Sequence, residues 1–351
     1  MLGRFESILQ AALIVSLVFG ASPLKRVEGM SYIFSWKLYL SSIAIGILAS
    51  AGGIFYIQKY FWSSLSMATI MDILIFTCSI CTWIIVFLLF FVQRLELPAI
   101  ISELYATHNR IGRVSYGRKY LLSMVCMTVV NAVPQIYQLV AGKFSWWKIL
   151  ESTLFYLFYN IPAVVAGQYS VLLNLLSDQL ASISNLLSSS KFNLEVQHLV
   201  EIHFSLCSLA ARINQAYDIF LLQTVTLPFV AVIMRTYVNI IYIVKPGEYS
   251  FQKMIASVPG LIVNCIMIVM VVSAARRAKN CAKNFNLLLF DALMTSKSLG
   301  KDNNLRSYVA MDYNINQSAC GMFSLDYPLL TSMMASTATY VILLVQLTWL
   351  Q

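Results

Sequence analysis

Charged residues are scarce in this 351-residue chain. They make up 11% of it, less than half of the fraction usual in soluble globular proteins, whereas aliphatic, aromatic and sulfur-containing residues make up 59%. A chain of this composition cannot cover its surface with polar groups, so it needs lipid around it. It also leaves no room for a second, soluble domain.

The sequence lacks the patterns of several other classes of protein. Its seven cysteines are scattered, four of them inside apolar runs, which excludes a disulfide framework. Cys78 and Cys81 have CxxC spacing but no second Cys or His pair, so we interpret them as small buried thiols and predict no metal site. No set of nucleophile, base and orienting group and no phosphate loop is present, so we predict neither an enzyme nor a cofactor. The histidines, His108, His198 and His203, are expected at the surface or in packing.

Basic residues give a formal net charge of +9, but they are dispersed between the hydrophobic runs. A nucleic-acid-binding protein would gather them on one polar surface. We therefore predict no nucleic-acid partner and interpret these residues as determinants of membrane topology.

Continuous apolar runs predict an all-α, polytopic membrane protein with seven transmembrane helices. Each span needs roughly 20 mainly apolar residues. The whole chain, 1–351, is expected to form one transmembrane domain, with spans near 36–57, 70–92, 120–141, 150–171, 217–243, 254–275 and 322–349.

The distribution of charge predicts the orientation of these spans. Most Lys and Arg residues fall on the side that holds the N-terminus, which places the N-terminus in the cytosol and the C-terminus outside. This orientation is the reverse of that of a G-protein-coupled receptor. An earlier apolar run, Ile8 to Phe19, is too short to span, and we expect it at the membrane interface, with a cleaved signal peptide as the alternative.

Two segments outside the spans have helical periodicity. Leucine and isoleucine recur at spacings of three and four in 172–187 and again in 199–213, and Ser188 to Asn193 separates the two as a turn. We predict an antiparallel helical hairpin in the cytosol. We expect this hairpin, within 172–215, to form a cytosolic helical anchor together with the amphipathic region 276–320. The anchor would pack either within one subunit or between subunits.

Polar residues inside spans are expensive in lipid, so they are functional hypotheses. Most of these residues lie in the outer half or the middle of their spans, so we predict an outward-facing ligand pocket with aromatic walls. The alternative is that they form hydrogen bonds between helices or belong to an interfacial aromatic belt. Arg235 is the strongest candidate because it lies far from either end of its span. The predicted ligand-binding residues are Asp72, Trp83, Gln138, Glu151, Tyr159 and Arg235.

The most specific signal lies near the end of the chain. Cys320, Gly321, Phe323, Leu325, Asp326 and Tyr327, followed by Thr339, Tyr340 and Gln346, resemble the C-terminal signature of insect gustatory receptors, which are related to insect odorant receptors and their co-receptor. Leu347 departs from the usual Phe of that signature and instead resembles the co-receptor ending. The resemblance is sharp over about thirty residues and diffuse elsewhere.

The resemblance implies a tetramer in which the last helix lines a central pore and the cytosolic helices anchor the subunits. Thr339, Leu343, Gln346 and Leu347 share one side of a helix. Four copies would form an apolar ring at Leu343, which can block ions by dewetting, beside an amide ring at Gln346. The alternative is a Leu-rich helix packed in a bundle.

These observations predict a gustatory receptor: a ligand-gated, non-selective cation channel opened by a small tastant, homotetrameric or heteromeric, in the plasma membrane of the dendrites of gustatory neurons. A G-protein-coupled receptor and a small-solute transporter are the alternatives. The former requires the opposite orientation, and the latter would favour internal repeats and broken helices.

Overall fold

The fold is described here from a computed structural model of the chain. The structure describes residues 2–18, 23–26, 32–61, 67–112, 146–189, 193–244, 251–296, 299–311 and 313–349, together with a few positions between 114 and 132. The predicted all-α class is confirmed, since helices form nearly all of this part of the chain and two short hairpins are its strands.

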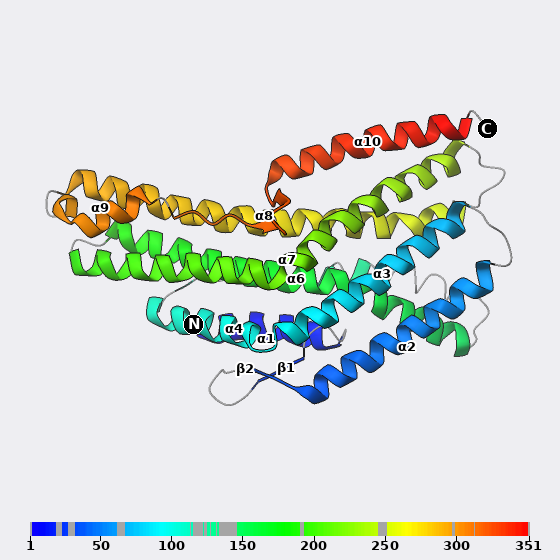
Figure 1. The fold of residues 1–351 in the computed structure, drawn as a ribbon, viewed down its shortest axis with the longest axis horizontal. Coiled ribbons are helices and arrows are strands. Elements are labelled where there is room, and N and C mark those ends of the chain that lie inside the picture. Colours follow the sequence, from blue (N-terminus) through cyan, green and yellow to red (C-terminus); the bar gives the residue numbers. More distant parts are fainter. Residues whose placement is uncertain are drawn as a thin grey trace.

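Three long helices run through the length of the molecule (Figure 1). They are α6 (Trp146–Ser189), α7 (Asn193–Val244) and α8 (Phe251–Thr295), and they pack against one another. Each contains one proline, Pro162, Pro228 and Pro259 respectively, yet each helix continues through it. The prolines therefore do not produce the broken helices that a transporter would favour.

The predicted hairpin between α6 and α7 is present, with α6 ending at Ser189 and α7 beginning at Asn193. All ten apolar positions of the two periodic segments are buried, because one stripe of each helix faces the other long helices. These buried residues are Leu173, Leu176, Leu180, Ile183 and Leu187 of α6 and Leu199, Ile202, Leu206, Leu209 and Ile213 of α7.

Two further apolar helices, α2 (Trp36–Phe61) and α3 (Met67–Val92), lie at the end of the molecule opposite α9 (Figure 1). They pack against each other and against α6, and α3 also packs against α7. They match the first two predicted spans. The predicted third span falls mostly outside the described residues, although its described positions are helical.

Helix α4 (Glu96–Ile111) follows α3 after a 69° bend. Its bounds were not predicted, although Leu97, Ile100, Ile101 and Leu104 have the spacing of one helix face and are all buried. The bend redirects the chain along α6 and α7, which α4 contacts.

The N-terminal helix α1 (Leu2–Val18) packs against the protein along one face, and its expected location at the membrane interface stays a prediction. Phe5, Ile8, Leu9 and Ala12 form one buried face. Helix α1 contacts α6, and the Phe5 ring stacks on His108 of α4 at 5.0 Å. The apolar run therefore has a protein surface as its partner. A hairpin of β1 (Leu24–Arg26) and β2 (Tyr32–Phe34) leads from here into α2.

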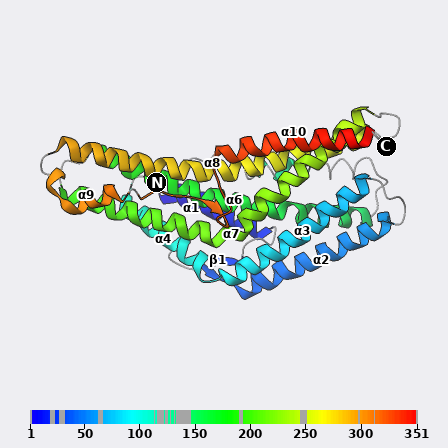
Figure 2. The ribbon, with the colours of Figure 1, turned by 45° about the horizontal axis from the view of Figure 1, so that its top comes forward.

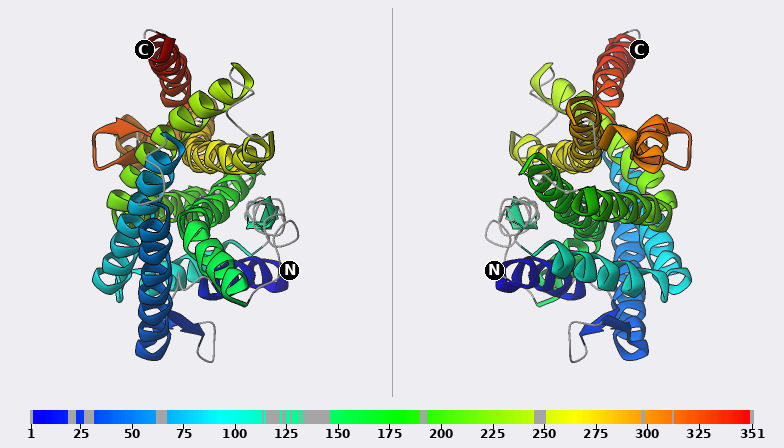
Figure 3. Two further views of the ribbon diagram at one scale, coloured as in Figure 1. Left: turned by 90° about the vertical axis from the view of Figure 1, so that its right-hand side faces the viewer. Right: turned by 90° about the vertical axis from the view of Figure 1, so that its left-hand side faces the viewer.

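The chain ends with a short helical tip, a small hairpin and one long helix. The tip comprises η2 (Leu299–Lys301) and α9 (Asn303–Ala310), the hairpin β3 (Ser318–Ala319) and β4 (Phe323–Ser324), and the last helix is α10 (Tyr327–Trp349). Seen along the molecule, α10 stands at the edge of the bundle (Figure 3). It runs beside the C-terminal part of α7 and the N-terminal part of α8 (Figure 2).

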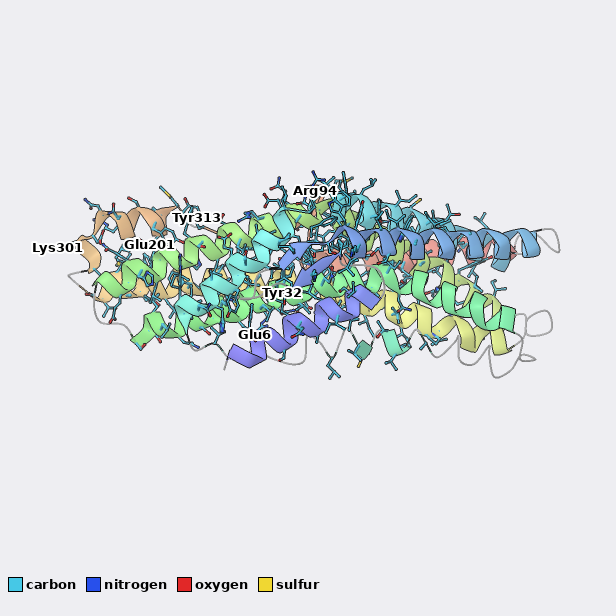
Figure 4. All side chains as sticks on the ribbon, turned by 90° about the horizontal axis from the view of Figure 1, so that it is seen from below. Glu6, Tyr32, Arg94, Glu201, Lys301 and Tyr313 are labelled. Carbon is cyan, nitrogen blue, oxygen red and sulfur yellow. The ribbon has the colours of Figure 1, made fainter. Side chains whose placement is uncertain are left out.

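Polar residues mark the end of the molecule that holds α9. Figure 4 places Lys301, Glu201 and Tyr313 toward that end, and Arg94 and Tyr32 near the middle of its length.

Within the described residues, three helical stretches are long and apolar enough to cross a membrane: Glu195–Ile241, Val258–Thr295 and Tyr327–Leu347. The bent pair formed by Trp83–Val92 and Glu96–Ile111 could form a fourth. This count covers length and composition alone and leaves out the stretches outside the described residues.

Candidate functional site

The predicted signature near the C-terminus folds into a junction, residues Gln317–Tyr327, between the long helices and α10. Its centre is the β3–β4 hairpin, whose turn contains Cys320 with φ 49° and Gly321 with φ 66°. Left-handed backbone is the region that glycine occupies without steric cost. Gly321 therefore adopts its turn conformation without strain, and the sequence from Cys320 to Met322 reverses the chain over three residues.

The junction is fixed to α7 by hydrogen bonds to its backbone and side chains. The backbone N–H groups of Ser318 and Cys320 donate to Asn214 and Asp218, which are one helical turn apart on α7. Gln317 is buried; its amide donates to the Ala210 carbonyl at 3.1 Å. Buried backbone donors need such partners, so these contacts determine where the hairpin sits.

The side-chain oxygen of Gln317 completes this network by accepting a hydrogen bond from the buried Tyr169 hydroxyl of α6 at 3.3 Å. The junction therefore contacts both α6 and α7.

Asp326 joins the junction to α8 and starts α10. Its carboxylate accepts the backbone N–H of Tyr327, the first residue of α10, at 2.8 Å, and places a negative charge at the helix N-terminus, where the helix dipole favours it. The same carboxylate pairs with Arg276 at 3.0 Å and Lys279 at 3.7 Å, both on α8. The Tyr327 ring lies 4.0 Å from the Arg276 guanidinium carbon. Helix α10 consequently begins at Tyr327, five residues after the start of the predicted span.

Among the described helical stretches that are long and apolar enough to cross a membrane, α10 is the most exposed. Only 6% of its most apolar window is buried inside the chain, against 50% for the window in α8. Thr339, Leu343, Gln346 and Leu347, the predicted pore residues, are all exposed, as is Tyr340.

The opposite side of α10 contacts α7. Val341 is buried, and Leu344 and Val345 pack against a cluster of Tyr237, Val238 and Ile241. The four predicted pore residues thus point away from the contact that holds α10 to its own chain.

The predicted ligand-binding residues are only partly described. Arg235 of α7 lies against the buried Gly260 of α8, so close that a Cβ on that glycine would be 2.2 Å from Nη1. Trp83 of α3 occupies the corresponding space over Gly46 of α2 and stacks on Phe87 at 5.6 Å. Each therefore packs where a glycine allows a close approach between two helices.

The side chains of the other four predicted ligand-binding residues are not described. Asp72 lies on α3, and Glu151 and Tyr159 lie on α6, but their side chains are outside the described residues, as is the whole of Gln138. The predicted convergence of these residues on one pocket stays a prediction.

Sequence reasoning missed a charged contact that holds α4. Arg212 of α7 pairs with both Glu96, at 3.0 Å, and Glu103 of α4. The Gln179 amide of α6 also donates to the Leu104 carbonyl at 3.0 Å. Glu96 and Glu103 are seven residues apart, two helical turns, which is the signal that could have identified them as one charged face.

A polar cluster is buried where α7, α8 and α9 meet. His203 is fully buried, stacks on Phe285 at 4.3 Å and shares a 2.6 Å hydrogen bond with the Tyr308 hydroxyl. Burial lowers the pKa of His203 to about 4 and raises the pKa of the Cys207 thiol to about 12. His203 is neutral at physiological pH and serves packing, as predicted; His108 is also buried, and His198 is exposed.

Cysteines have no disulfide partner among the described residues. Cys81 is exposed on α3, so the interpretation of this residue as a buried thiol is wrong: it faces the outer side of an apolar helix, where lipid rather than protein would surround it. Cys78 is outside the described side chains. The described part of the chain contains no group of three or more His, Cys, Asp or Glu that could hold a metal ion.

Comparisons with known proteins agree on the class of this chain. The family described as 7tm Chemosensory receptor matches residues 9–348. The structure is similar to the insect olfactory receptor OR5 from Machilis hrabei, with a TM-score of 0.75 and 12% identity over 98% of this chain and 99% of that one.

The same receptor in complex with eugenol gives a TM-score of 0.72 at 13% identity, over 98% of this chain and 99% of that one. No curated protein matches the chain by sequence. At these identities the structural likeness concerns the fold.

Proposed function

The chain belongs to the 7tm chemosensory receptor family, and from this premise we propose that it is a gustatory receptor that acts as a ligand-gated, non-selective cation channel. It is a multi-pass membrane protein with seven transmembrane helices and a receptor, not an enzyme. The proposal adds its mode of action, its assembly, its orientation and its ligand class to this identity.

The exposed face of α10 carries the channel proposal. Leu343 is 48% exposed and Leu347 is 60% exposed, so this face needs either lipid or a second subunit to cover it. Copies of the chain around an axis would cover this face and line a central path with Leu343, Gln346 and Leu347. An apolar ring blocks ions by dewetting when it is narrow, and the amide oxygens of Gln346 can replace part of a cation's hydration shell.

Exposed apolar residues near the other end of α8 support an assembly of subunits, either a homotetramer or a heteromer with related receptors. Leu287, Phe290 and Met294 are 55%, 48% and 75% exposed on the segment predicted to lie in the cytosol, where lipid cannot cover them. Contact between subunits would remove this surface from water.

A small-molecule tastant is the proposed ligand, and the plasma membrane of gustatory dendrites is the proposed location. A receptor with the same fold has been solved with eugenol, which supports a small organic ligand for this chain. Arg235 and Trp83 are the described candidates for contact with it, and bitter compounds and sugars both fit the residue types predicted for the pocket.

Current recordings in a cell line that expresses the chain test the proposal. Panels of sugars, alkaloids and amino acids should identify a compound that opens a cation current. Leu343→Ser should raise the basal current, by up to several hundred-fold if about 1 kcal/mol from each of four subunits adds. Met334→Ser, at an exposed position on the side of α10 opposite Leu343, is the control and should leave the basal current near wild type.

Gln346→Glu should favour divalent cations, because it places negative charge in the path. Unchanged basal current and selectivity in both pore variants of a channel that still opens would show that α10 does not line the pore. Tags provide the orientation test: an N-terminal tag should be inaccessible on intact cells and a C-terminal tag accessible. The opposite labelling would favour a G-protein-coupled receptor.

A further inference from the structure

Two hydroxyl side chains share the face of α10 that carries the predicted pore residues. Ser332 and Thr339 are seven residues apart, and Thr339 and Leu343 are four apart, so all three lie on one side of the helix. All three side chains are exposed. At a rise of about 1.5 Å per residue, the two hydroxyls lie between the junction and Leu343, within roughly 17 Å of that leucine. Sequence reasoning had not placed Ser332 on this face.

Both hydroxyls donate their single proton to the helix itself. The Ser332 hydroxyl donates to the Pro328 carbonyl at 2.9 Å, and the Thr339 hydroxyl donates to the Ala335 carbonyl at 3.1 Å. A carbonyl oxygen can only accept, so the direction of these hydrogen bonds is fixed. A hydroxyl has one proton and two lone pairs, and each exposed oxygen is therefore left with acceptor capacity alone.

The other groups on this face of α10 do not discriminate between ions of opposite charge. The helix contains no Asp, Glu, Lys or Arg between Tyr327 and Trp349. Leu343 is apolar, and the Gln346 amide has both an acceptor oxygen and an NH2 donor, so by rotating it can face a cation or an anion. The partial positive charge at the N-terminus of α10 falls off within the first turn, where the Asp326 carboxylate lies. Acceptor-only oxygens are the remaining source of a charge preference on this face.

From these observations we infer that Ser332 and Thr339 set the preference of the channel for cations over anions. In an assembly of copies around an axis, each hydroxyl would form a ring of oxygens with lone pairs toward the path. Such a ring replaces part of the hydration shell of a cation and offers an anion no donor. The inference rests on the proposed function, because it requires that α10 lines the path. It assigns charge selectivity to the hydroxyls rather than to the Gln346 amide.

Thr337 provides the matched control because it forms the same kind of bond on the opposite side of α10. Its hydroxyl donates to the Met333 carbonyl at 2.8 Å. It lies four residues from the buried Val341, and Met333 packs against the core, so this side of the helix faces the protein. Hydrogen bonds of this kind are ordinary for Ser and Thr in helices. The face on which they lie, rather than the bond, therefore distinguishes Ser332 and Thr339.

Permeability measurements on the full-length receptor test the inference. Leu343→Ala shortens the apolar ring without adding a hydroxyl and should give a basal current, so no tastant is needed. Reversal potentials in a sodium chloride gradient then give the ratio of sodium to chloride permeability. In this background Thr339→Val and Ser332→Ala should each lower the ratio about fivefold, because each removes a ring of acceptors worth about one net hydrogen bond. Thr339→Ser, which keeps the hydroxyl, and Thr337→Val should retain the ratio of the background.

Surface labelling establishes that each variant reaches the cell surface. An unchanged ratio in both Thr339→Val and Ser332→Ala, in a background that conducts, would overturn the inference and leave the proposed function intact. An equal fall in Thr337→Val, or a fall in Gln346→Leu alone, would also overturn it, because the helix or the amide would then carry the preference. A Leu343→Ala receptor at the surface with the basal current of wild type would overturn the inference together with the proposed function.

Discussion

Leu206 of α7 and Leu343 of α10 are the same residue type in two apolar helices, but their surroundings are opposite. Leu206 is fully buried among the long helices, whereas Leu343 is 48% exposed. The long helices bury an apolar stripe against one another and pair charges within one chain, as Arg277 does with Asp178 and Arg212 with Glu96. Helix α10 is held at its start by Asp326 and along one side by α7, but its other side has no covering surface within the chain. The core of the bundle is thus formed within one subunit, whereas the candidate gate is completed by its surroundings.

The largest expected difference comes from the same substitution at these two leucines. Leu206→Ala should lower the free energy of unfolding by about 2–5 kcal/mol, because it leaves a cavity in a fully packed region. Leu343→Ala should lower it by less than about 1 kcal/mol. Melting temperatures of the two solubilised variants measure this contrast, and equal losses of stability would show that α10 is as deeply packed as α7.

A pH series tests the buried polar cluster in the long helices. The pKa of His203 is about 4 in the folded state, below the ordinary value of 6.5, so the unfolded chain binds an extra proton between these values. The stability that His203 contributes is therefore complete above pH 6.5 and declines as the pH falls toward 4. Between pH 7 and pH 5 the loss should be about 2 kcal/mol.

The matched variant for this series is His203→Gln, which cannot titrate. Its melting temperature should fall less than that of wild type over the same pH interval. Parallel curves would assign the pH dependence to other groups.

Asp326→Asn probes the contact between the two regions. It preserves an acceptor for the Tyr327 backbone N–H but removes the charge that pairs with Arg276 and Lys279. We expect the free energy of unfolding to fall by about 1 kcal/mol, because these pairs are partly exposed. The tastant concentration that half-opens the channel should change by more than the roughly fivefold factor that corresponds to this free energy. Asp291→Asn, at an exposed position of α8, is the control. A melting temperature that falls without any shift in gating would limit Asp326 to a structural role.

The smallest effect on stability is expected at Arg235. Arg235→Ala should change the tastant response while surface expression stays near normal. Gly260→Ala should change it too, since its Cβ would force the flexible guanidinium to move. Val230→Ala, at an exposed position of α7, is the matched control. Wild-type dose dependence in both Arg235→Ala and Gly260→Ala would make this contact a packing feature alone.

Composition and periodicity predicted most of the architecture because they reflect a local requirement. Apolar residues must be buried or covered by lipid, so long apolar runs identify α2, α3, α6, α7, α8 and α10, and the three-and-four spacing identifies the buried stripe of the α6–α7 hairpin. Membership in the chemosensory receptor family is confirmed, and the signature that predicted it is the junction itself: Gly321 lies in its turn and Asp326 at the start of α10.

Only the tertiary structure decided which residues meet. Asp218, Arg212 and Gln317 are unremarkable in the sequence, yet they bond to segments about 100 residues away, because α7 passes between α4 and the junction. The burial of α1 and the 69° bend before α4 were likewise decided by available surfaces rather than by local propensity. Sequence by itself determined that the chain belongs in a membrane and where its helices run, because burial follows composition. Which face of α10 is left exposed was decided by the packing of Val341 and Leu344 on one side, since a helix that is apolar all round does not specify its own contact.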